Sequence, residues 1–160
     1  MPVLSDQSQM EAYVKSNMLE MVTDMADAVY GRLHPRLVAC SFEQRAVEAV
    51  FAMQHWMRNG NNVVHGGVIA TMLDSIGGVV ARCFTPQDAI SPTVTLQVSY
   101  LAAVPIDARV HVRASVTFPG RRLLHIHTEA FDAADQTRLY ATGVAMYYIK
   151  SKNGERGHAE

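Results

Sequence analysis

The sequence has few cysteines, no excess charge of either sign and no long hydrophobic run. Only two of its 160 residues are cysteine, Cys40 and Cys83, and it has no Cys-x-x-Cys pair, which excludes a disulfide framework. Fourteen basic residues are balanced by fifteen acidic ones, for a formal net charge of −1. That balance argues against a nucleic-acid-binding protein, which normally carries a basic excess on one face.

A membrane or secreted protein is not expected either. The longest stretch with little charge, residues 59–81, contains Asp74 and falls short of the roughly 20 apolar residues that a membrane-spanning helix needs. The N-terminus lacks the basic start and apolar run of a signal peptide. We therefore expect a cytoplasmic protein without a membrane partner, and the low cysteine content agrees with a reducing compartment.

The composition that remains, 49% hydrophobic and 18% charged over 160 residues, fits one globular domain. Apolar residues recur at three- and four-residue steps over 8–30 and 67–84, which predicts two helices. After Pro92 the apolar period becomes two, which is typical of β-strands. The expected strands span residues 36–42, 45–56, 93–100, 109–118, 122–131 and 137–149.

The order of these elements predicts an α+β fold. Strands joined by short turns must pair antiparallel, and the long apolar helix needs a face to bury itself against. We expect a curved antiparallel sheet of about six strands wrapped round one long central helix, plus an N-terminal helix. The expected organisation is a helical segment over 1–35 packed on the domain, the domain itself over 36–150, and a frayed polar tail over 151–160.

The second helix carries a lone acid. Opposite its apolar stripe the residues are small, and Asp74 is the only formally charged residue between Asn59 and Ala81. A solvent-facing helix side would normally carry several Lys, Glu or Gln residues. A carboxylate in such a partly apolar setting is a stronger base, which suits catalysis, although an ordinary exposed Asp is the simpler interpretation.

The second helix begins at His65-Gly66-Gly67. Two glycines let the backbone approach a ligand, and the first N–H groups of a helix have no internal partner and lie in positive potential. Such a turn can stabilise a carbonyl oxygen that becomes negative, or it can simply start the helix. Asp74 lies about 10 Å further along the axis, so a shared site would need two subunits.

The string His65-Gly-Gly-Val-Ile-Ala-Thr-Met-Leu-Asp74, followed by Thr93-Val-Thr-Leu-Gln-Val-Ser-Tyr-Leu101, resembles the hotdog-fold thioesterases of the phenylacetate-pathway type. The resemblance covers about residues 36–149. It implies the hotdog fold, in which a curved sheet wraps a central helix. It also implies a homodimer or homotetramer that hydrolyses acyl-coenzyme A thioesters without a cofactor or metal.

The resemblance also implies roles for individual residues. Asp74 matches the catalytic acid, as general base or nucleophile, and Thr93 matches a hydroxyl beside it. Gly67, together with Gly66, matches the backbone N–H donor to the thioester oxygen, in the motif that begins at His65. This donor and the acid come from different subunits of the dimer. Asn59 matches a polar residue that helps to hold the attacking water or the thioester. Asn61 and Asn62 are alternative candidates for the same role. Arg121 and Arg122, in a turn, match a basic position for the phosphates of coenzyme A, although they also fit a solvated turn.

Two alternatives from other functional classes remain open. One is a non-catalytic acyl-CoA-binding or sensing protein of the same fold, and the other is a hotdog hydratase or dehydratase that acts on the acyl chain. The presence of Asp74 argues against the first, and the missing Asp/His pattern argues against the second. The leading hypothesis is hydrolysis of a medium- or long-chain fatty acyl-CoA, or of an aryl-acetyl-CoA, to the free acid and CoA.

Overall fold

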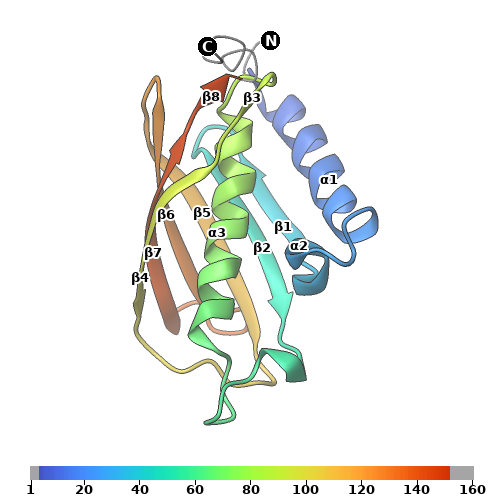
Figure 1. The fold of residues 1–160 in the computed structure, drawn as a ribbon, viewed down its shortest axis with the longest axis vertical. Coiled ribbons are helices and arrows are strands. Elements are labelled where there is room, and N and C mark those ends of the chain that lie inside the picture. Colours follow the sequence, from blue (N-terminus) through green and yellow to red (C-terminus); the bar gives the residue numbers. More distant parts are fainter. Residues whose placement is uncertain (1–3, 152–160) are drawn as a thin grey trace, which may run out of the picture.

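The structure, a computed structural model, describes residues 4–151 and consists of a six-stranded antiparallel sheet that curves round one long helix (Figure 1). The strand order is β1-β2-β5-β6-β7-β4, so β1 and β4 form the two edges. A two-stranded sheet of β3 and β8 lies apart from it. The elements are α1 (Gln7–Thr23), α2 (Val29–Leu33), β1 (Arg36–Ser41), β2 (Ala46–Ala52), η1 (His55–Met57), α3 (Gly66–Cys83), β3 (Ala89–Ile90), β4 (Thr93–Tyr100), β5 (Arg109–Pro119), β6 (Leu123–Asp132), β7 (Leu139–Tyr148) and β8 (Lys150–Ser151).

The central helix α3 is held by its apolar stripe. Met72, Leu73, Ile76 and Val80 are fully buried against the sheet, and each large apolar side chain of this kind contributes about 1.5–3 kcal/mol on burial. The helix is long and apolar enough to cross a membrane by length and composition, but 56% of it is buried inside the protein. This burial is what the central helix of a hotdog fold requires, and the predicted fold class is confirmed.

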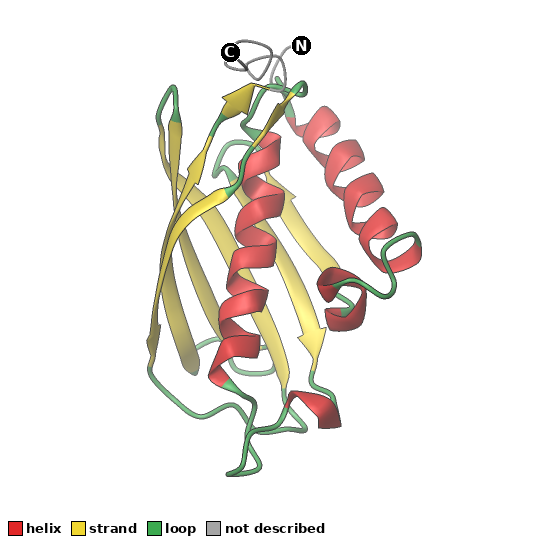
Figure 2. Cartoon of the chain, in the orientation of Figure 1, coloured by secondary structure: helices red, strands yellow, loops and turns green. Residues whose placement is uncertain are grey.

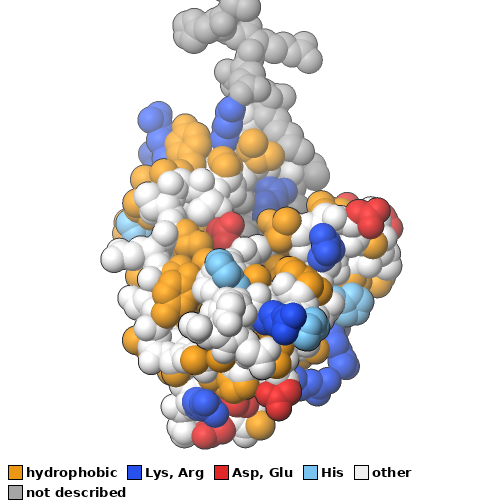
Figure 3. Space-filling view, turned by 60° about the horizontal axis from the view of Figure 1, so that its bottom comes forward, with side chains coloured by type: hydrophobic (Ala, Val, Ile, Leu, Met, Phe, Trp, Pro, Cys, Tyr) orange, Lys and Arg blue, Asp and Glu red, His pale blue; other side chains and the backbone are white. Residues whose placement is uncertain are grey.

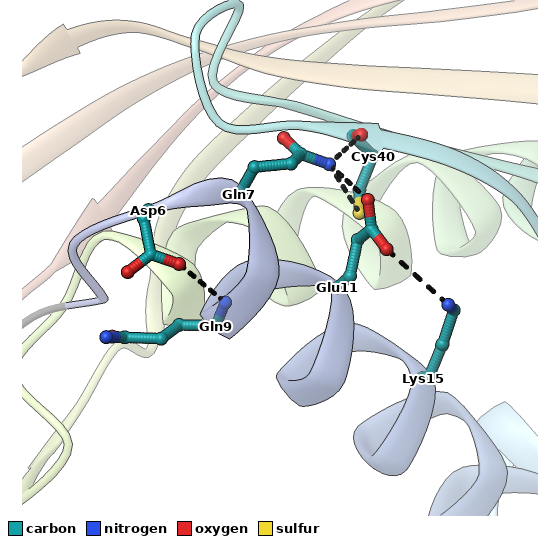
Figure 4. A network of polar contacts seen from close by, with 6 residues as sticks. All are labelled: Asp6, Gln7, Gln9, Glu11, Lys15 and Cys40. Carbon is teal, nitrogen blue, oxygen red and sulfur yellow. Dashed lines mark hydrogen bonds and ion pairs between the residues drawn. The ribbon is translucent and has the colours of Figure 1, made fainter.

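The N-terminal helix α1 is fixed to the edge strand β1 by polar contacts at its first turn (Figure 4). Asp6 caps the helix, since its Oδ1 accepts from the Gln9 N–H at 2.9 Å. The carboxamide of Gln7 pairs with strand backbone: Nε2 donates to the Cys40 carbonyl at 3.0 Å, and Oε1 accepts from the Phe42 N–H at 2.7 Å. Gln7 therefore imitates the backbone of a neighbouring strand.

The expected helix over 8–30 is wrong in extent, because the chain forms two helices there. The first, α1, ends at Thr23, and the second, α2, begins at Val29 (Figure 2). Gly31 lies inside α2 rather than ending a helix, and a Cβ on it would lie only 2.2 Å from the Met25 carbonyl oxygen. The backbone of residues 24–28 turns back and packs against Gly31. Apolar periodicity cannot predict this contact, because it reports only which residues share a helix face.

Smaller differences lie around the sheet. The expected strand over 45–56 ends at Ala52, because His55–Met57 form a 3-10 turn that leads into the loop before α3. The short pair β3 and β8 was not expected. The remaining strands lie within a few residues of their predicted ranges. Of the expected tail over 151–160, Ser151 is instead paired in β8, and residues 152–160 lie outside the described residues.

Candidate functional site

Asp74 lies midway along α3, and its carboxylate is held by two hydroxyl groups from the sheet. The Thr93 hydroxyl, on β4, donates to Asp74 Oδ1 at 2.9 Å, and the Tyr147 hydroxyl, on β7, lies 2.8 Å from the same oxygen. Tyr147 also lies 2.9 Å from the Asp74 main-chain carbonyl oxygen, so its single proton is shared between two acceptors. Thr93 thus lies beside Asp74, at the position that the resemblance implies for a hydroxyl.

Tyr147 reaches Asp74 because the neighbouring helix position is a glycine. A Cβ on Gly77 would lie 2.4 Å from the Tyr147 hydroxyl oxygen, closer than atoms can pack. Burial, together with the charge of Asp74, raises the pKa of Tyr147 well above its ordinary value, so its hydroxyl stays protonated and donates. The small residue at position 77 thus makes room for a side chain of the sheet.

This arrangement leaves one carboxylate oxygen available. Oδ1 of Asp74 has two hydroxyl partners, whereas Oδ2 has none among residues 4–151. A third hydroxyl belongs to Tyr30 on α2. Burial raises the pKa of Tyr30, and the negative charge of Asp74 raises it further. The carboxylate is oriented by its neighbours and presents a free oxygen that can accept a proton from water.

The His65-Gly66-Gly67 turn forms the N-terminus of α3, as predicted. His65 caps the helix with its own ring, whose Nδ1 accepts from the Gly67 N–H at 2.9 Å. A neutral ring therefore carries its proton on Nε2. The Gly66 N–H has no partner among the described residues, and the Tyr100 hydroxyl donates to the Gly66 carbonyl oxygen at 2.9 Å. Gly66 is thus the turn residue whose N–H is available to a ligand, whereas the N–H of Gly67 is occupied.

Asn59 and Gly66 line the same cavity, which has a volume of about 350 Å³ and also includes Tyr100 and Tyr140. The Asn59 Oδ1 closes the loop before the helix by accepting from the Asn61 N–H at 2.8 Å. Its rivals Asn61 and Asn62 are exposed and do not line this cavity. Of the three asparagines, Asn59 is therefore the one that lies beside the turn.

Within one protomer the two groups of candidate residues stay apart. Asp74, Thr93 and Tyr147 form one cluster, whereas the His65-Gly66-Gly67 turn and Asn59 share a separate cavity with no hydrogen bond to Asp74. The structure thus presents a carboxylate without a neighbouring backbone donor, and a backbone donor without a neighbouring carboxylate.

Residues 61–138, which include both the turn and Asp74, match the family model of the thioesterase superfamily. Over this segment the chain is similar to the thioesterase superfamily. The helix α3, with the glycine turn at its start and Asp74 midway along it, lies within the matched segment.

Solved structures of thioesterase-superfamily proteins share the fold. A putative thioesterase from Ralstonia eutropha, described as related to phenylacetic acid degradation, is 21% identical with a TM-score of 0.73, and the match covers 86% of this chain and 99% of that one. A thioesterase family protein from Silicibacter pomeroyi is 25% identical with a TM-score of 0.70, over 84% and 98% of the two chains.

A third similar structure holds a ligand. It is a hypothetical thioesterase from Streptococcus pneumoniae with coenzyme A, 15% identical with a TM-score of 0.65, over 73% of this chain and 86% of that one. No curated protein matches the sequence.

The basic turn of this chain lies far from the glycine turn (Figure 1). Arg121 and Arg122 are exposed in the hairpin between β5 and β6, at the end of the sheet opposite the start of α3 (Figure 1). The Arg122 carbonyl oxygen accepts from the Ile149 N–H at 2.8 Å, which fixes the turn against the end of β7. Between residues 4 and 151 no group of three His, Cys, Asp or Glu side chains is placed to hold a metal ion.

Sequence reasoning missed Tyr147, Tyr30 and Tyr100. All three come from elements other than α3, and each lies beside a residue that the sequence did identify. Gly77 and Gly78 gave a partial signal, because glycines inside a helix point to a close neighbour. The identity of that neighbour depends on strand register, which no local pattern contains.

Proposed function

We propose that this protein is an acyl-CoA thioesterase that hydrolyses a fatty acyl-CoA or aryl-acetyl-CoA to the free acid and CoA. The observation that carries the proposal is the Asp74 carboxylate, which is held at Oδ1 by the Thr93 and Tyr147 hydroxyls and is free at Oδ2. The match to the thioesterase superfamily model supports the reaction class, and the coenzyme A in a similar structure supports the substrate class.

The reaction needs little beyond this arrangement. Asp74 Oδ2 takes a proton from water as the water oxygen bonds to the thioester carbon, and the carbonyl electron pair moves onto its oxygen. The Gly66 N–H, at the positive end of α3, stabilises that oxygen. When the pair returns, the carbon–sulfur bond breaks, and the CoA sulfur receives the proton held by Asp74. The products are a carboxylic acid and a thiol.

The two halves act together only in a dimer, and the edge strand β4 supports one. Val94, Tyr100 and Leu101 lie along or just after this unpaired edge and are 55%, 55% and 57% exposed. Large exposed apolar side chains beside an open strand edge favour pairing with a second copy. Hydrophobic side chains are also interspersed with histidine and basic ones on the end of the molecule where α3 begins (Figure 3). We place the homodimer, or a tetramer built from it, in the cytoplasm.

Thiol release from a panel of acyl-CoAs tests the proposal directly. Asp74→Asn keeps the shape of the side chain but removes the base, so we expect kcat to fall by at least about 10² while the melting temperature changes little. Unchanged turnover in this variant would contradict the mechanism. Tight acyl-CoA binding without thiol release by the wild type would instead favour the binding protein, and an enoyl chromophore would favour the hydratase.

The role of Asp74 can be resolved in labelled water. In a single turnover in H₂¹⁸O, a general base delivers the label to the released acid. A nucleophile instead forms an anhydride with the acyl group, and water that attacks the Asp74 carbon of this anhydride leaves the label in the Asp74 carboxylate, so label in Asp74 identifies a nucleophile. We expect the label in the acid, because the two hydroxyl donors on Oδ1 hold the carboxylate in place and leave Oδ2 facing the water.

Complementation between two inactive variants tests the shared site. Gly66→Pro deletes the proposed donor N–H at the first position of α3, where proline is tolerated, and His65 already has the extended backbone that proline requires before it. Gly66→Ala is the matched control, since it adds a Cβ near the Tyr100 ring but keeps the N–H. We expect a loss of about 10²–10³ in kcat for the proline variant and a much smaller loss for the alanine variant.

Mixing the Asp74→Asn and Gly66→Pro proteins under conditions of subunit exchange should then restore activity. About half of the dimers are mixed, and each mixed dimer contains one site with both intact halves, so about a quarter of the wild-type rate is expected. No recovery despite demonstrated exchange would mean that the two halves do not meet across an interface.

A further inference from the structure

The sheet curves round α3, and its outer face lies on the side away from that helix (Figure 1). Side chains of a strand alternate between the two faces of a sheet. Leu124 and Tyr147 are buried on the inner face, where Tyr147 reaches Asp74 of α3. Their neighbours Leu123 and Tyr148 therefore point outward, and both side chains are exposed. The outer face thus presents large apolar side chains to solvent.

These side chains belong to one contiguous cluster on β5, β6 and β7. The Phe118 ring packs edge-on against His125, with ring centroids 5.8 Å apart, and Phe118 is 61% exposed. His125 lies opposite Met146, and Leu123 lies opposite Tyr148 in the adjacent row of the same face. We call this cluster the outer patch, and its members are Phe118, Leu123, His125, Val144, Met146 and Tyr148.

Charge divides the outer face into two halves. On β2 and β5, Glu48 holds two partners, since His111 Nε2 lies 2.9 Å from its Oε2 and Arg113 Nε lies 3.7 Å from its Oε1. Glu129, opposite Arg113, marks the boundary. Beyond it, β7 and β4 contain no Asp, Glu, Lys or Arg. Solvent-facing sheet surfaces normally carry such charges, so the uncharged half has the composition of a surface that is covered.

A second copy of the protein fits this surface better than a charged partner does. Without Asp, Glu, Lys or Arg, the outer patch neither repels an identical patch nor attracts a partner of one sign of charge. A contact in which one patch meets its own copy also gives every patch a partner in a closed assembly.

We propose that the outer patches of two dimers bind each other, so that the protein is a tetramer whose sheets pack back to back. The proposal rests on the β4-paired dimer of the proposed function. It names the face through which that dimer is doubled, and it distinguishes this arrangement from a tetramer that associates through its helices.

The area of this face agrees with a stable contact. Strands lie about 4.8 Å apart and rise about 3.4 Å per residue, so three strands of about eight residues present about 400 Å². Pairing of two β4 strands joins two such surfaces, and each dimer then offers about 800 Å², which is the area that each partner buries in a stable interface. A single chain offers only half of this area, so we expect dimers rather than monomers to associate here.

This arrangement leaves the candidate active site accessible. Asp74 and the glycine turn lie on α3, on the inner side of each sheet, whereas the outer patch lies on the opposite side. Contact between dimers therefore covers neither the carboxylate nor the backbone donor, and thiol release should not require the tetramer.

Lysine substitutions in the outer patch test the proposal. Val144→Lys and Phe118→Lys each bury an unpaired charge in the contact, so the dissociation constant of the tetramer should rise at least about 10²-fold. Sedimentation velocity should then show a tetramer for the wild type and a dimer for each variant. Val144→Thr keeps the shape without the charge, and Leu19→Lys places a charge at an exposed apolar position of α1, so both controls should remain tetramers.

A photoreactive side chain maps the same contact without an added charge. p-Benzoylphenylalanine at position 118 keeps an aromatic ring in the outer patch and, on irradiation, bonds to a C–H group of whatever covers it. In a mixture of isotopically labelled and unlabelled protein, we expect bonds from one copy to β5, β6 or β7 of another. Bonds to α1 or α3 of another copy, or none between copies, overturn the proposal.

The assembly states separate this proposal from the proposed function. A tetramer that survives both lysine substitutions forms through another face, and a wild type that remains a dimer at about 100 μM lacks the contact. Either result overturns the proposal and leaves the thioesterase site intact. A wild-type monomer overturns the β4 dimer as well. A tetramer that depends on the outer patch but releases no thiol supports the contact and overturns only the proposed activity.

Discussion

At the scale of single residues, Gly77 and Tyr147 decide how the candidate acid is held. The missing side chain at position 77 gives the Tyr147 hydroxyl the space it needs to reach both the carboxylate and the main-chain carbonyl of Asp74. The neighbouring Gly78 has no such role, because a Cβ there would lie 4.0 Å from the Tyr147 ring. The contact with Tyr147 therefore requires glycine at position 77 but not at position 78.

This difference predicts opposite effects for two equivalent substitutions. Gly77→Ala places a methyl group against the Tyr147 hydroxyl, so the free energy of unfolding should fall by about 1–3 kcal/mol. The thioesterase activity should fall as well, because Asp74 loses a hydroxyl partner. Gly78→Ala should instead raise the free energy of unfolding by up to about 1 kcal/mol, since alanine favours helix. Denaturant melts of both variants provide the comparison, and equal effects would contradict this account of the Tyr147 contact.

At the scale of secondary-structure elements, α1 both closes the fold and forms one wall of a cavity of about 320 Å³ between α1, α2 and α3. Met10, Val14 and Met18 bury one row of α1 in the core, and the adjacent row that contains Asn17 faces the cavity. The helix is fixed at its first turn through Gln7, whose carboxamide bonds to the backbone on both sides of Ser41. The position of α1 therefore controls the shape of the cavity.

Removal of this contact should loosen α1 selectively. Gln7→Ala deletes two hydrogen bonds to the strand backbone, each contributing about 0.5–1.5 kcal/mol. We expect faster hydrogen exchange for the amides of α1 and unchanged exchange in β5 and β6. Gln9→Ala is the control, because the only hydrogen-bond partner of its side chain within residues 4–151 is the nearby Ser5 N–H. If exchange in the central strands increases equally, the effect of Gln7 is global and its role as a local clamp is wrong.

At the scale of the whole molecule, burial of tyrosines links stability to alkaline pH. Burial, reinforced by the hydrogen bond to Asp132, raises the pKa of Tyr140 from its ordinary value near 10 to about 12. Burial also raises the pKa of Tyr147. Because the unfolded chain loses these protons at lower pH than the folded chain, both contributions to stability are complete below pH 10. The contribution of Tyr140 is lost as the pH rises through about 12, whereas that of Tyr147 declines over a range that extends to higher pH.

The prediction is a steep loss of stability between pH 10 and about 12. Tyr140→Phe cannot ionise at this position, so the loss over the same interval should be shallower in this variant. Urea melts at several pH values measure both slopes. Parallel slopes for the variant and the wild type would show that ionisation of Tyr140 does not limit alkaline stability.

The sequence by itself determined the parts of this protein that depend on local pattern. The apolar stripe of α3, the alternation in the strands and the glycine turn are properties of neighbouring residues, and they were enough to predict the sheet round a central helix. The same patterns marked Asp74, because a lone carboxylate in an uncharged helix stands out without reference to any partner.

Only the tertiary structure decided what surrounds these elements. The contact of Tyr147 with Asp74 joins residues 73 positions apart, and the cavity between α1, α2 and α3 is lined by segments from distant parts of the chain. The fold-back before Gly31 likewise depends on close packing between backbones. These features follow from strand register and from how helices rest on the sheet, and long-range packing of this kind leaves no periodic signal in the chain.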